Sequence, residues 1–365
     1  MTPGATLSRY LAGRFLAWCL SVFFAMEVIV FLLDYLELIR RGASRPDATL
    51  LSLLEMAALK QPYMAQQIMP FAILFGTMLL FWRMTRSNEL VVARSAGISA
   101  WQFLAPAVVV SFLVGLFAIT IFNPIASVTQ ARYAALEARI LQTSSNNMTV
   151  SRTGFWLRQS SDDGTAAVIH ADTMRMPQTQ LADVTFLTYA KETELTGRID
   201  AKSALLGEGS WRIESGTRWT PTQPTTPFAR LELPTNLTPS KIQEGFAAPE
   251  TMSFWQLPGF IALLERSGFS AQRHRLYFDT LLARPILFSA LVVVAAVFSL
   301  RMQRRGGAGW MIGAGIACAF ALYFLSDVVL ALGLAAAIPV ALAAWTPAGV
   351  TWLIGASLVF HLEDG

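Results

Sequence analysis

The sequence predicts an α-helical membrane protein with six transmembrane helices and an all-β domain inserted between helices 3 and 4. The apolar composition indicates the membrane, and one long polar segment between apolar stretches indicates the inserted domain. Of the 365 residues, 54% are hydrophobic and 14% are charged, and the mean hydropathy is +0.48. Soluble globular proteins carry about 25% charged residues, so much of this chain is expected in lipid.

Six apolar stretches reach the length of about 20 residues that a helix needs to cross the hydrocarbon core. They are residues 15–36, 62–82, 100–122, 276–300, 309–332 and 340–360. The last two are nearly continuous, with Asp327 as the only charge between Gly309 and Phe360. Together they are too long for one crossing, and Pro339 predicts a turn between them, so they form a hairpin.

The polar segment 123–271 reads as β structure with helical connectors. Partial alternation of apolar and polar residues, rich in Val, Thr and aromatic side chains, predicts strands. These strands cover 148–158, 165–176 and 181–189, with turns at 162–164, 176–177 and 208–209. Short strands at this spacing favour a sandwich or jelly roll. Ser253 and Gln256 have the spacing of a capping box, which predicts a helix over 254–266.

Arginines in the short loops predict the orientation, because such loops stay in the cytoplasm when they are basic. With six helices, one side collects Arg9, Arg14, Arg83, Arg86, Arg94, Arg301, Arg304 and Arg305. Both termini are therefore cytoplasmic, and the β domain is extracytoplasmic. The first loop, 37–61, lies on the same side as the β domain although it carries Arg40, Arg41, Arg45 and Lys60. The first helix is expected to be an uncleaved membrane anchor.

A charged segment, 83–97, separates the second and third predicted crossings. On a helical wheel Arg83, Arg86, Leu90 and Arg94 share one arc, which predicts an amphipathic helix along the membrane surface. Gly97 is expected to end it, and a capping box of Ser99 and Gln102 to start the third crossing. Two interpretations stand at this point: arginines contacting lipid phosphates, or a docking element for a cytoplasmic partner.

The residues expected of several enzyme classes are missing. No lysine follows a glycine, so no phosphate-binding loop of the Gly-x-x-x-x-Gly-Lys type is present, and the zinc-protease and Gly-x-Ser-x-Gly patterns are absent too. The three histidines are scattered, and Cys19 and Cys318 lie in predicted membrane helices. We therefore expect no catalysis, cofactor, metal site or disulfide. Lysines are few, and the arginines lie mostly beside apolar runs and do not form a basic stripe. Nucleic acid is therefore not an expected partner.

Residues 86–99 resemble the coupling-helix segment of the lipopolysaccharide export permease family LptF/LptG, and the likeness extends over nearly the whole chain. Further matching stretches are 8–10, 67–76, 235–242 and 320–327. Residues 235–239 and the sequence Arg40-Arg41-Gly42 are more similar to the G subunit of that family than to the F subunit.

The resemblance implies a subunit of an ABC transporter in the Gram-negative inner membrane. In this family six membrane helices carry a periplasmic jelly roll, and a G and an F subunit pair above a dimeric cytoplasmic ATPase. Lipopolysaccharide enters from the outer leaflet and passes to periplasmic bridge proteins. The implied organisation is helices 1–3 in 1–122, the β domain in 123–271 and helices 4–6 in 272–365.

By the same resemblance, segment 83–97 seats in a groove of the ATPase, with Glu89 as the central polar contact. The residues that would carry the coupling are Arg83, Arg86, Glu89, Leu90, Arg94 and Gly97.

The basic residues outside the cytoplasm then gain an expected role in lipopolysaccharide binding. Lipid A carries phosphates, for which arginine is a bidentate partner. Arg40, Arg41 and Arg132 match basic positions of the family. Leu136 lies near a position where members have a second arginine. Two alternatives stand: Arg139 compensates for that arginine, or headgroup contact is weaker here or shared with the partner subunit. Asp34 stands where some members have a lysine. The alternative for each arginine is ordinary anchoring at the membrane interface.

Three ionisable residues are predicted at membrane depth, where each would be costly facing lipid: Glu27, Arg284 and Asp327. Asp327 is shared with the family. Ion pairing, substrate contact and packing of the lateral gates on the first and fifth helices remain as alternatives.

Two other classes compete with the export function. A membrane sensor with a periplasmic ligand-binding β domain would have the same outline. A sensor usually carries a cytoplasmic output domain, and here only residues 361–365 follow the last predicted crossing. An intramembrane enzyme would need clustered His, Asp or Ser side chains at one depth, and the sequence shows no such cluster.

Overall fold

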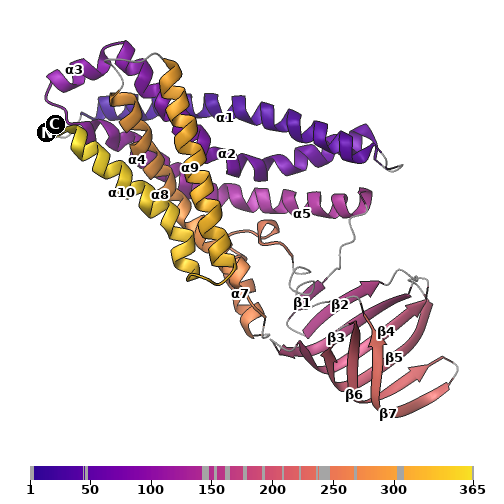
Figure 1. Ribbon diagram of the computed structural model, residues 1–365. Coiled ribbons are helices and arrows are strands. Elements are labelled where there is room, and N and C mark those ends of the chain that lie inside the picture. Colours follow the sequence, from indigo (N-terminus) through magenta and orange to yellow (C-terminus); the bar gives the residue numbers. More distant parts are fainter. Residues whose placement is uncertain are drawn as a thin grey trace. The chain divides into compact units, whose positions relative to one another are not determined.

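The computed structural model describes residues 4–43, 45, 48–141, 148–151, 154–160, 165–175, 179–190, 194–207, 209–221, 223–235, 237, 247–266, 269–301 and 308–363. The chain forms two compact units. The helical unit comprises Met1–Leu141, Ser253–Trp255 and Arg275–Gly365, and the β unit comprises Gln142–Met252 and Gln256–His274. Figure 1 shows the elements of both units.

The helical unit confirms the six predicted crossings. Its elements are α1 (Ala5–Gly42), α2 (Leu50–Arg86), α3 (Glu89–Ser95), α4 (Ala100–Phe117), the π-helical turn η1 (Ala118–Phe122), α5 (Asn123–Ile140), α8 (Gln272–Arg301), α9 (Ala308–Leu334) and α10 (Val340–Glu363). Six helices of the described residues are long and apolar enough to span a membrane, with α4, η1 and α5 counting as one. The turn between α9 and α10 contains Pro339, as the sequence predicts.

The predicted loop 37–61 is wrong, because α1 and α2 extend far beyond their apolar windows. With 38 residues, α1 is about 57 Å long at 1.5 Å per residue, almost twice the hydrocarbon thickness. The polar ends stay helical because Glu, Arg and Lys are good helix formers. Thr49 begins α2 with a capping box, in which Thr49 and Ser52 exchange side-chain to backbone hydrogen bonds. The connection is therefore short, 43–49.

Close packing holds the helical unit together, because lipid gives no hydrophobic driving force between helices. In an apolar 18-residue stretch of α8, 72% of the residues are buried, against 6% in such a stretch of α1 and 17% in that of α9. A Cβ added at Gly115 of α4 would lie 2.5 Å from Pro285 Cα of α8, so only glycine permits this approach. The α8 helix is central, and α1 and α9 are peripheral.

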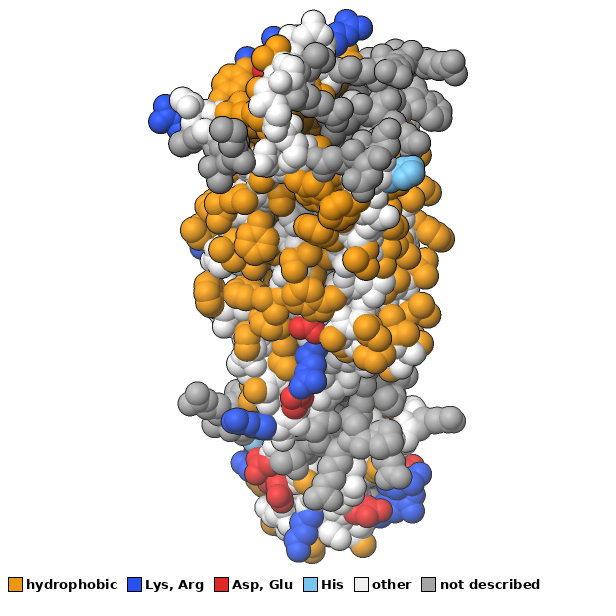
Figure 2. All heavy atoms as spheres, turned by 90° about the vertical axis from the view of Figure 1, so that its left-hand side faces the viewer, with side chains coloured by type: hydrophobic (Ala, Val, Ile, Leu, Met, Phe, Trp, Pro, Cys, Tyr) orange, Lys and Arg blue, Asp and Glu red, His pale blue; other side chains and the backbone are white. Residues whose placement is uncertain are grey.

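Large apolar side chains face outward from the peripheral helices. Phe24 on α1, Phe320 on α9 and Leu353 on α10 are 61%, 71% and 72% exposed. Figure 2 shows hydrophobic side chains covering most of the helical face in view. Such a surface is suited to lipid or to another membrane protein.

The β unit is one antiparallel sheet of seven described strands in sequential order, which confirms the predicted all-β domain. The strands are β1 (Met148–Ser151), β2 (Gly154–Ser160), β3 (Thr165–Arg175), β4 (Gln180–Ala190), β5 (Glu194–Leu206), β6 (Ser210–Thr220) and β7 (Gln223–Pro234). The single strand predicted over 148–158 is wrong, because Ser151 pairs with Gly154 across a hairpin. The predicted turns at 162–164 and 176–177 lie outside the described residues.

One face of the sheet carries its core. Ile169, Phe186 and Ile199 lie side by side on β3, β4 and β5 and are at most 3% exposed. The Trp211 ring on β6 is fully buried and meets Phe186 with ring centroids 6.0 Å apart. These strands alternate inward apolar and outward polar residues, which is the period-two pattern that the sequence displays.

The return from the sheet contains a 3-10 turn, η2 (Pro249–Thr251), and the helix α7 (Leu257–Arg266). The predicted helix over 254–266 therefore begins three residues late, after a turn at 254–256. In that turn the Phe254 N–H donates to Asn123 Oδ1 at 2.7 Å.

The predicted boundary at residue 122 falls inside a continuous helix. The α5 helix belongs to the helical unit because it packs on α1 and α2 through a second apolar cluster that includes Leu38, Met56 and Tyr133. The compact units divide at Leu141 instead.

Candidate functional site

The predicted coupling helix 83–97 is not one helix. Arg83 and Arg86 form the last turn of α2, which ends where the Ser87 N–H bonds to Arg83 O at 2.9 Å. Asn88 then takes a φ of +58°, which an asparagine tolerates better than most side chains and which a continuing helix forbids. A new helix, α3, starts at Glu89. The predicted shared face of Arg83, Arg86, Leu90 and Arg94 is therefore wrong, because a helical wheel assumes one continuous helix and these residues lie on two helices.

The Glu89 carboxylate is held by two hydroxyl donors. Tyr10 Oη of α1 donates to Glu89 Oε2 at 3.1 Å, and Ser87 Oγ donates to Glu89 Oε1 at 2.8 Å. As the first residue of α3, Glu89 also lies at the positive end of that short helix. The carboxylate is therefore oriented from both sides before any partner binds.

The α3 helix is anchored on one side and free on the other. Leu90 is 7% exposed and belongs to the main core cluster, so it fixes α3 to the helical unit and offers little surface to a partner. Val92 is 66% exposed. Gly97 has a φ of +79° just after the helix, as predicted from its glycine. Arg94 lies on α3, and its side chain is outside the described part of the structure.

Arginines and aromatic rings surround this segment. The guanidinium group of Arg83 lies 5.8 Å from the Trp18 ring centroid. That of Arg86 lies 5.2 Å from the Trp82 ring centroid. Arg14 lies 4.9 Å from the Tyr10 ring. Such cation–π pairs are typical of the interface between membrane and water.

We call Tyr10, Arg83, Arg86, Glu89 and Val92 the α3 surface. Glu89 is half-buried, and the other four are exposed. In Figure 1, α3 lies at the end of the helical unit where α1 begins and α10 ends.

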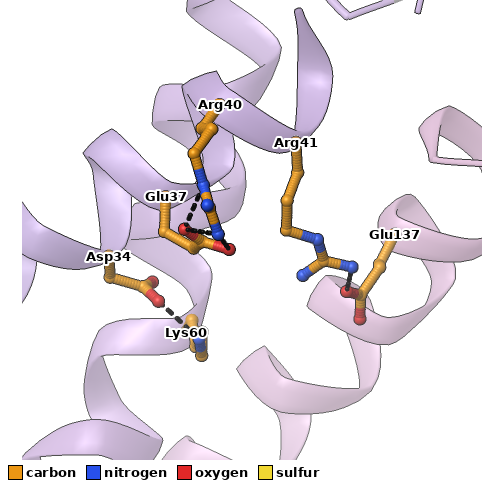
Figure 3. A network of polar contacts seen from close by, with 6 residues as sticks. All are labelled: Asp34, Glu37, Arg40, Arg41, Lys60 and Glu137. Atoms are coloured by element: carbon orange, nitrogen blue, oxygen red, sulfur yellow. Dashed lines mark hydrogen bonds and ion pairs between the residues drawn. The ribbon is translucent and has the colours of Figure 1, made fainter. Parts of the chain in front are cut away.

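The opposite end of α1 carries a six-charge cluster of Asp34, Glu37, Arg40, Arg41, Lys60 and Glu137, drawn in Figure 3. Arg41 pairs with Glu137 of α5 at 2.8 Å. Arg40 pairs with Glu37 one turn earlier at 2.8 Å. Lys60 of α2 pairs with Asp34 and lies 5.6 Å from the Tyr133 ring. Three cations and three anions thus join α1, α2 and α5.

The predicted lipopolysaccharide-binding arginines lie on two helices, Arg40 and Arg41 on α1 and Arg132 and Arg139 on α5. Arg41 pairs with Glu137 of α5. Arg132 and Arg139 are exposed on α5, seven residues apart and so about two turns apart on similar faces. The Arg40 side chain is 78% exposed and keeps donors free beyond its pairing with Glu37. Lys60, which the sequence placed in a loop, is a helical residue that neutralises Asp34.

The three ionisable residues at membrane depth are not joined to one another. Arg284 is 9% exposed and donates from Nη1 to Gln66 Oε1 at 2.8 Å. Asp327 is exposed on α9, and Glu27 on α1 keeps a buried Oε2 for which the described residues provide no hydrogen-bond donor. Ion pairs among the described residues do not include any of the three.

Sequence reasoning missed two polar residues of the interior, Gln66 and Asn123. Both are at most 2% exposed. Their signal in the sequence is a single amide side chain within or beside an apolar run, which in lipid requires a hydrogen-bond partner.

Six spanning helices with a β domain inserted between the third and fourth define a class of multi-pass membrane protein. The model of the family described as "Lipopolysaccharide export system permease LptF/LptG" matches residues 9–360. The chain belongs to this family, as the resemblance predicts.

Two curated relatives carry the name lipopolysaccharide export system permease protein LptG. The protein from Haemophilus influenzae is 21% identical over 335 residues, covering 88% of this chain and 89% of the relative. The protein from Escherichia coli (strain K12) is 20% identical over 390 residues, covering 99% of both chains. The likeness therefore spans both units.

Proposed function

We propose that this chain is the G-type permease subunit of an ABC transporter that extracts lipopolysaccharide from the outer leaflet of the Gram-negative inner membrane. The observation that carries the proposal is the family match over residues 9–360. The subunit is non-catalytic, and a separate cytoplasmic ATPase supplies the energy. Its termini are cytoplasmic and its β unit is periplasmic.

The α3 surface is the docking element for the ATPase dimer. Its geometry suits force transmission, because α3 is bound to two separate parts of the helical unit. Leu90 packs into the core, and Glu89 is hydrogen-bonded to Tyr10 at the start of α1. A displacement of α3 by a closing ATPase then moves α1, which buries little of its surface within this chain.

The other end of α1 receives the lipopolysaccharide headgroup. Arg40, Arg41, Arg132 and Arg139 offer charge-assisted contacts to phosphates, and the exposed apolar faces of α1 and α9 hold acyl chains. A homologous F-type permease completes the cavity, and periplasmic bridge proteins receive the substrate from the β unit.

The test is Glu89→Ala in the full chain. The variant is expected to co-purify less ATPase and to release less lipopolysaccharide from inner-membrane vesicles, while its thermal unfolding stays close to that of the parent chain. Glu55→Ala is the matched control, because Glu55 is an exposed glutamate elsewhere, on α2. Equal ATPase recovery from both variants would remove the role assigned to Glu89.

A further inference from the structure

The helical unit contains a cavity of about 430 Å³ between α2, α8, α9 and α10. Its walls are mainly apolar, with Phe71, Leu287 and Leu322 among the lining residues, and its polar lining includes Gln66 and Arg284. Ligand pockets commonly have volumes of about 300–1,000 Å³ and combine apolar walls with a few converging polar groups. The cavity has the size and the lining of such a site.

Arg284 is a buried cation that lines this cavity. Its side chain is 9% exposed, and no carboxylate of the described residues lies within 4 Å of its guanidinium. Asp327 lines the same cavity but is exposed and does not pair with it. Because a buried charge is stabilised by an opposite charge or by several hydrogen bonds, the guanidinium favours an anion in the cavity.

A chain of hydrogen bonds orients a second donor, the side-chain amide of Gln66, on the same cavity. The Phe254 N–H donates to Asn123 Oδ1 at 2.7 Å, which turns Asn123 Nδ2 toward Gln66 Oε1 at 3.4 Å. The same oxygen accepts from Arg284 Nη1. The amide of Gln66 is thereby fixed with Oε1 toward both donors, and its buried Nε2 has no acceptor among the described residues. Both Gln66 and Arg284 line the cavity.

We propose that this cavity binds the single anionic head of an amphiphile, a carboxylate or a phosphate joined to an acyl chain. Arg284 supplies charge-assisted hydrogen bonds to the head, and Gln66 Nε2 adds another. The apolar walls around Phe71 and Leu322 take the chain. The site is bounded by four helices of this one subunit, and the proposal goes beyond the export function and does not depend on it.

Binding of radiolabelled probes to the full chain in detergent tests the proposal. The probes are palmitate, lysophosphatidic acid with a palmitoyl chain, and hexadecanol as the neutral analogue of equal chain length. We expect saturable binding of at least one anionic probe, about tenfold tighter than hexadecanol. The anionic probe that binds more tightly identifies the head as carboxylate or phosphate. Equal binding of all three probes, or no saturable binding, overturns the proposal.

Two variants test separately the charge of Arg284 and the free volume of the cavity. Arg284→Gln is expected to weaken binding of the anionic probe about tenfold, and Arg284→Lys less. Ala348→Leu keeps the charge but fills the cavity beside α10, where Ala348 is 1% exposed, and is expected to abolish binding. Arg266→Gln removes an exposed arginine of α7 and is expected to bind as the parent does. If Arg284→Gln does not fold, Ala348→Leu and the probe comparison still decide, and unchanged binding by Ala348→Leu contradicts the site.

Discussion

The hydroxyl of Tyr10 donates a 3.1 Å hydrogen bond to the carboxylate of Glu89, across 79 residues of sequence. This contact connects the start of α1 with the start of α3, the two elements that we propose to move together during export. Since Leu90 at the next position is buried in the core, α3 is held at adjacent residues by one polar and one apolar contact.

Replacement of this hydroxyl tests whether Tyr10 holds α3. Tyr10→Phe is expected to change the free energy of unfolding by less than about 1 kcal/mol, because the pair is exposed to solvent. Amide hydrogen exchange in residues 89–95 is expected to become faster. Tyr35→Phe removes a comparable hydroxyl contact, to Leu50 O, and should leave exchange in α3 unchanged. Equal exchange in all three proteins would show that Leu90 alone anchors the helix.

The six-charge cluster contains one pair that contributes more to stability than the others. Lys60→Met leaves Asp34 unpaired, and these two side chains are only 20% and 11% exposed. We expect a loss of about 1–3 kcal/mol in the free energy of unfolding, below the range for a fully buried pair. Arg40→Met, at a side chain that is 78% exposed, is expected to cost less than about 1 kcal/mol. Denaturation of both variants in detergent measures the difference, and similar losses would contradict this ranking.

The approach of α4 to α8 depends on a missing side chain. Gly115→Ala places a Cβ 2.5 Å from Pro285 Cα, so the helices must separate, at a cost of about 1–3 kcal/mol. Gly13→Ala on α1 meets no atom within 4 Å and is expected to raise stability slightly, because alanine favours helices. Thermal unfolding of the two variants should therefore shift in opposite directions. A stable Gly115→Ala variant would show that the two helices are not in close contact.

The β unit contains a carboxylate whose pairing depends on pH. Partial burial raises the pKa of Asp200, but hydrogen bonds from Arg198 and Thr185 outweigh it and hold the pKa below the usual value for aspartate. Because the folded pKa is lowered, the stabilisation is complete above the unfolded pKa and is lost as the pH falls through the folded pKa. The difference in thermal stability between the parent and Asp200→Asn is therefore expected to shrink as the pH falls from 6 toward 3, a range chosen to bracket about pH 3.9, the unperturbed value. A constant difference would show that Asp200 is not linked to folding in this way.

Apolar windows predicted the number and order of the crossings but not their length. Hydropathy registers the lipid-facing part of a helix, while the ends of α1 and α2 are extended by polar residues that pack and pair with one another. Lys60 of α2 and Asp34 of α1 form one such pair, and no sequence pattern in either helix predicts it. The predicted loop was therefore wrong.

The candidate sites were predicted as residues and not as geometry. Family likeness brought out Glu89, but the break at Asn88 depends on a single left-handed backbone conformation, which periodicity does not detect. The polar contact between Gln66 and Arg284 joins residues 218 positions apart. Only the packing of α2 against α8 brings them together, so a single sequence gives no sign of it.

The most direct test of the export function is purification of the tagged chain from its native membrane in mild detergent, with mass spectrometry of the proteins and lipids that accompany it. We expect an ATP-binding-cassette subunit, a second permease with six helices, and bound lipopolysaccharide. Recovery of the chain alone, or with a signalling partner and no glycolipid, would contradict the docking role of the α3 surface and favour a membrane sensor.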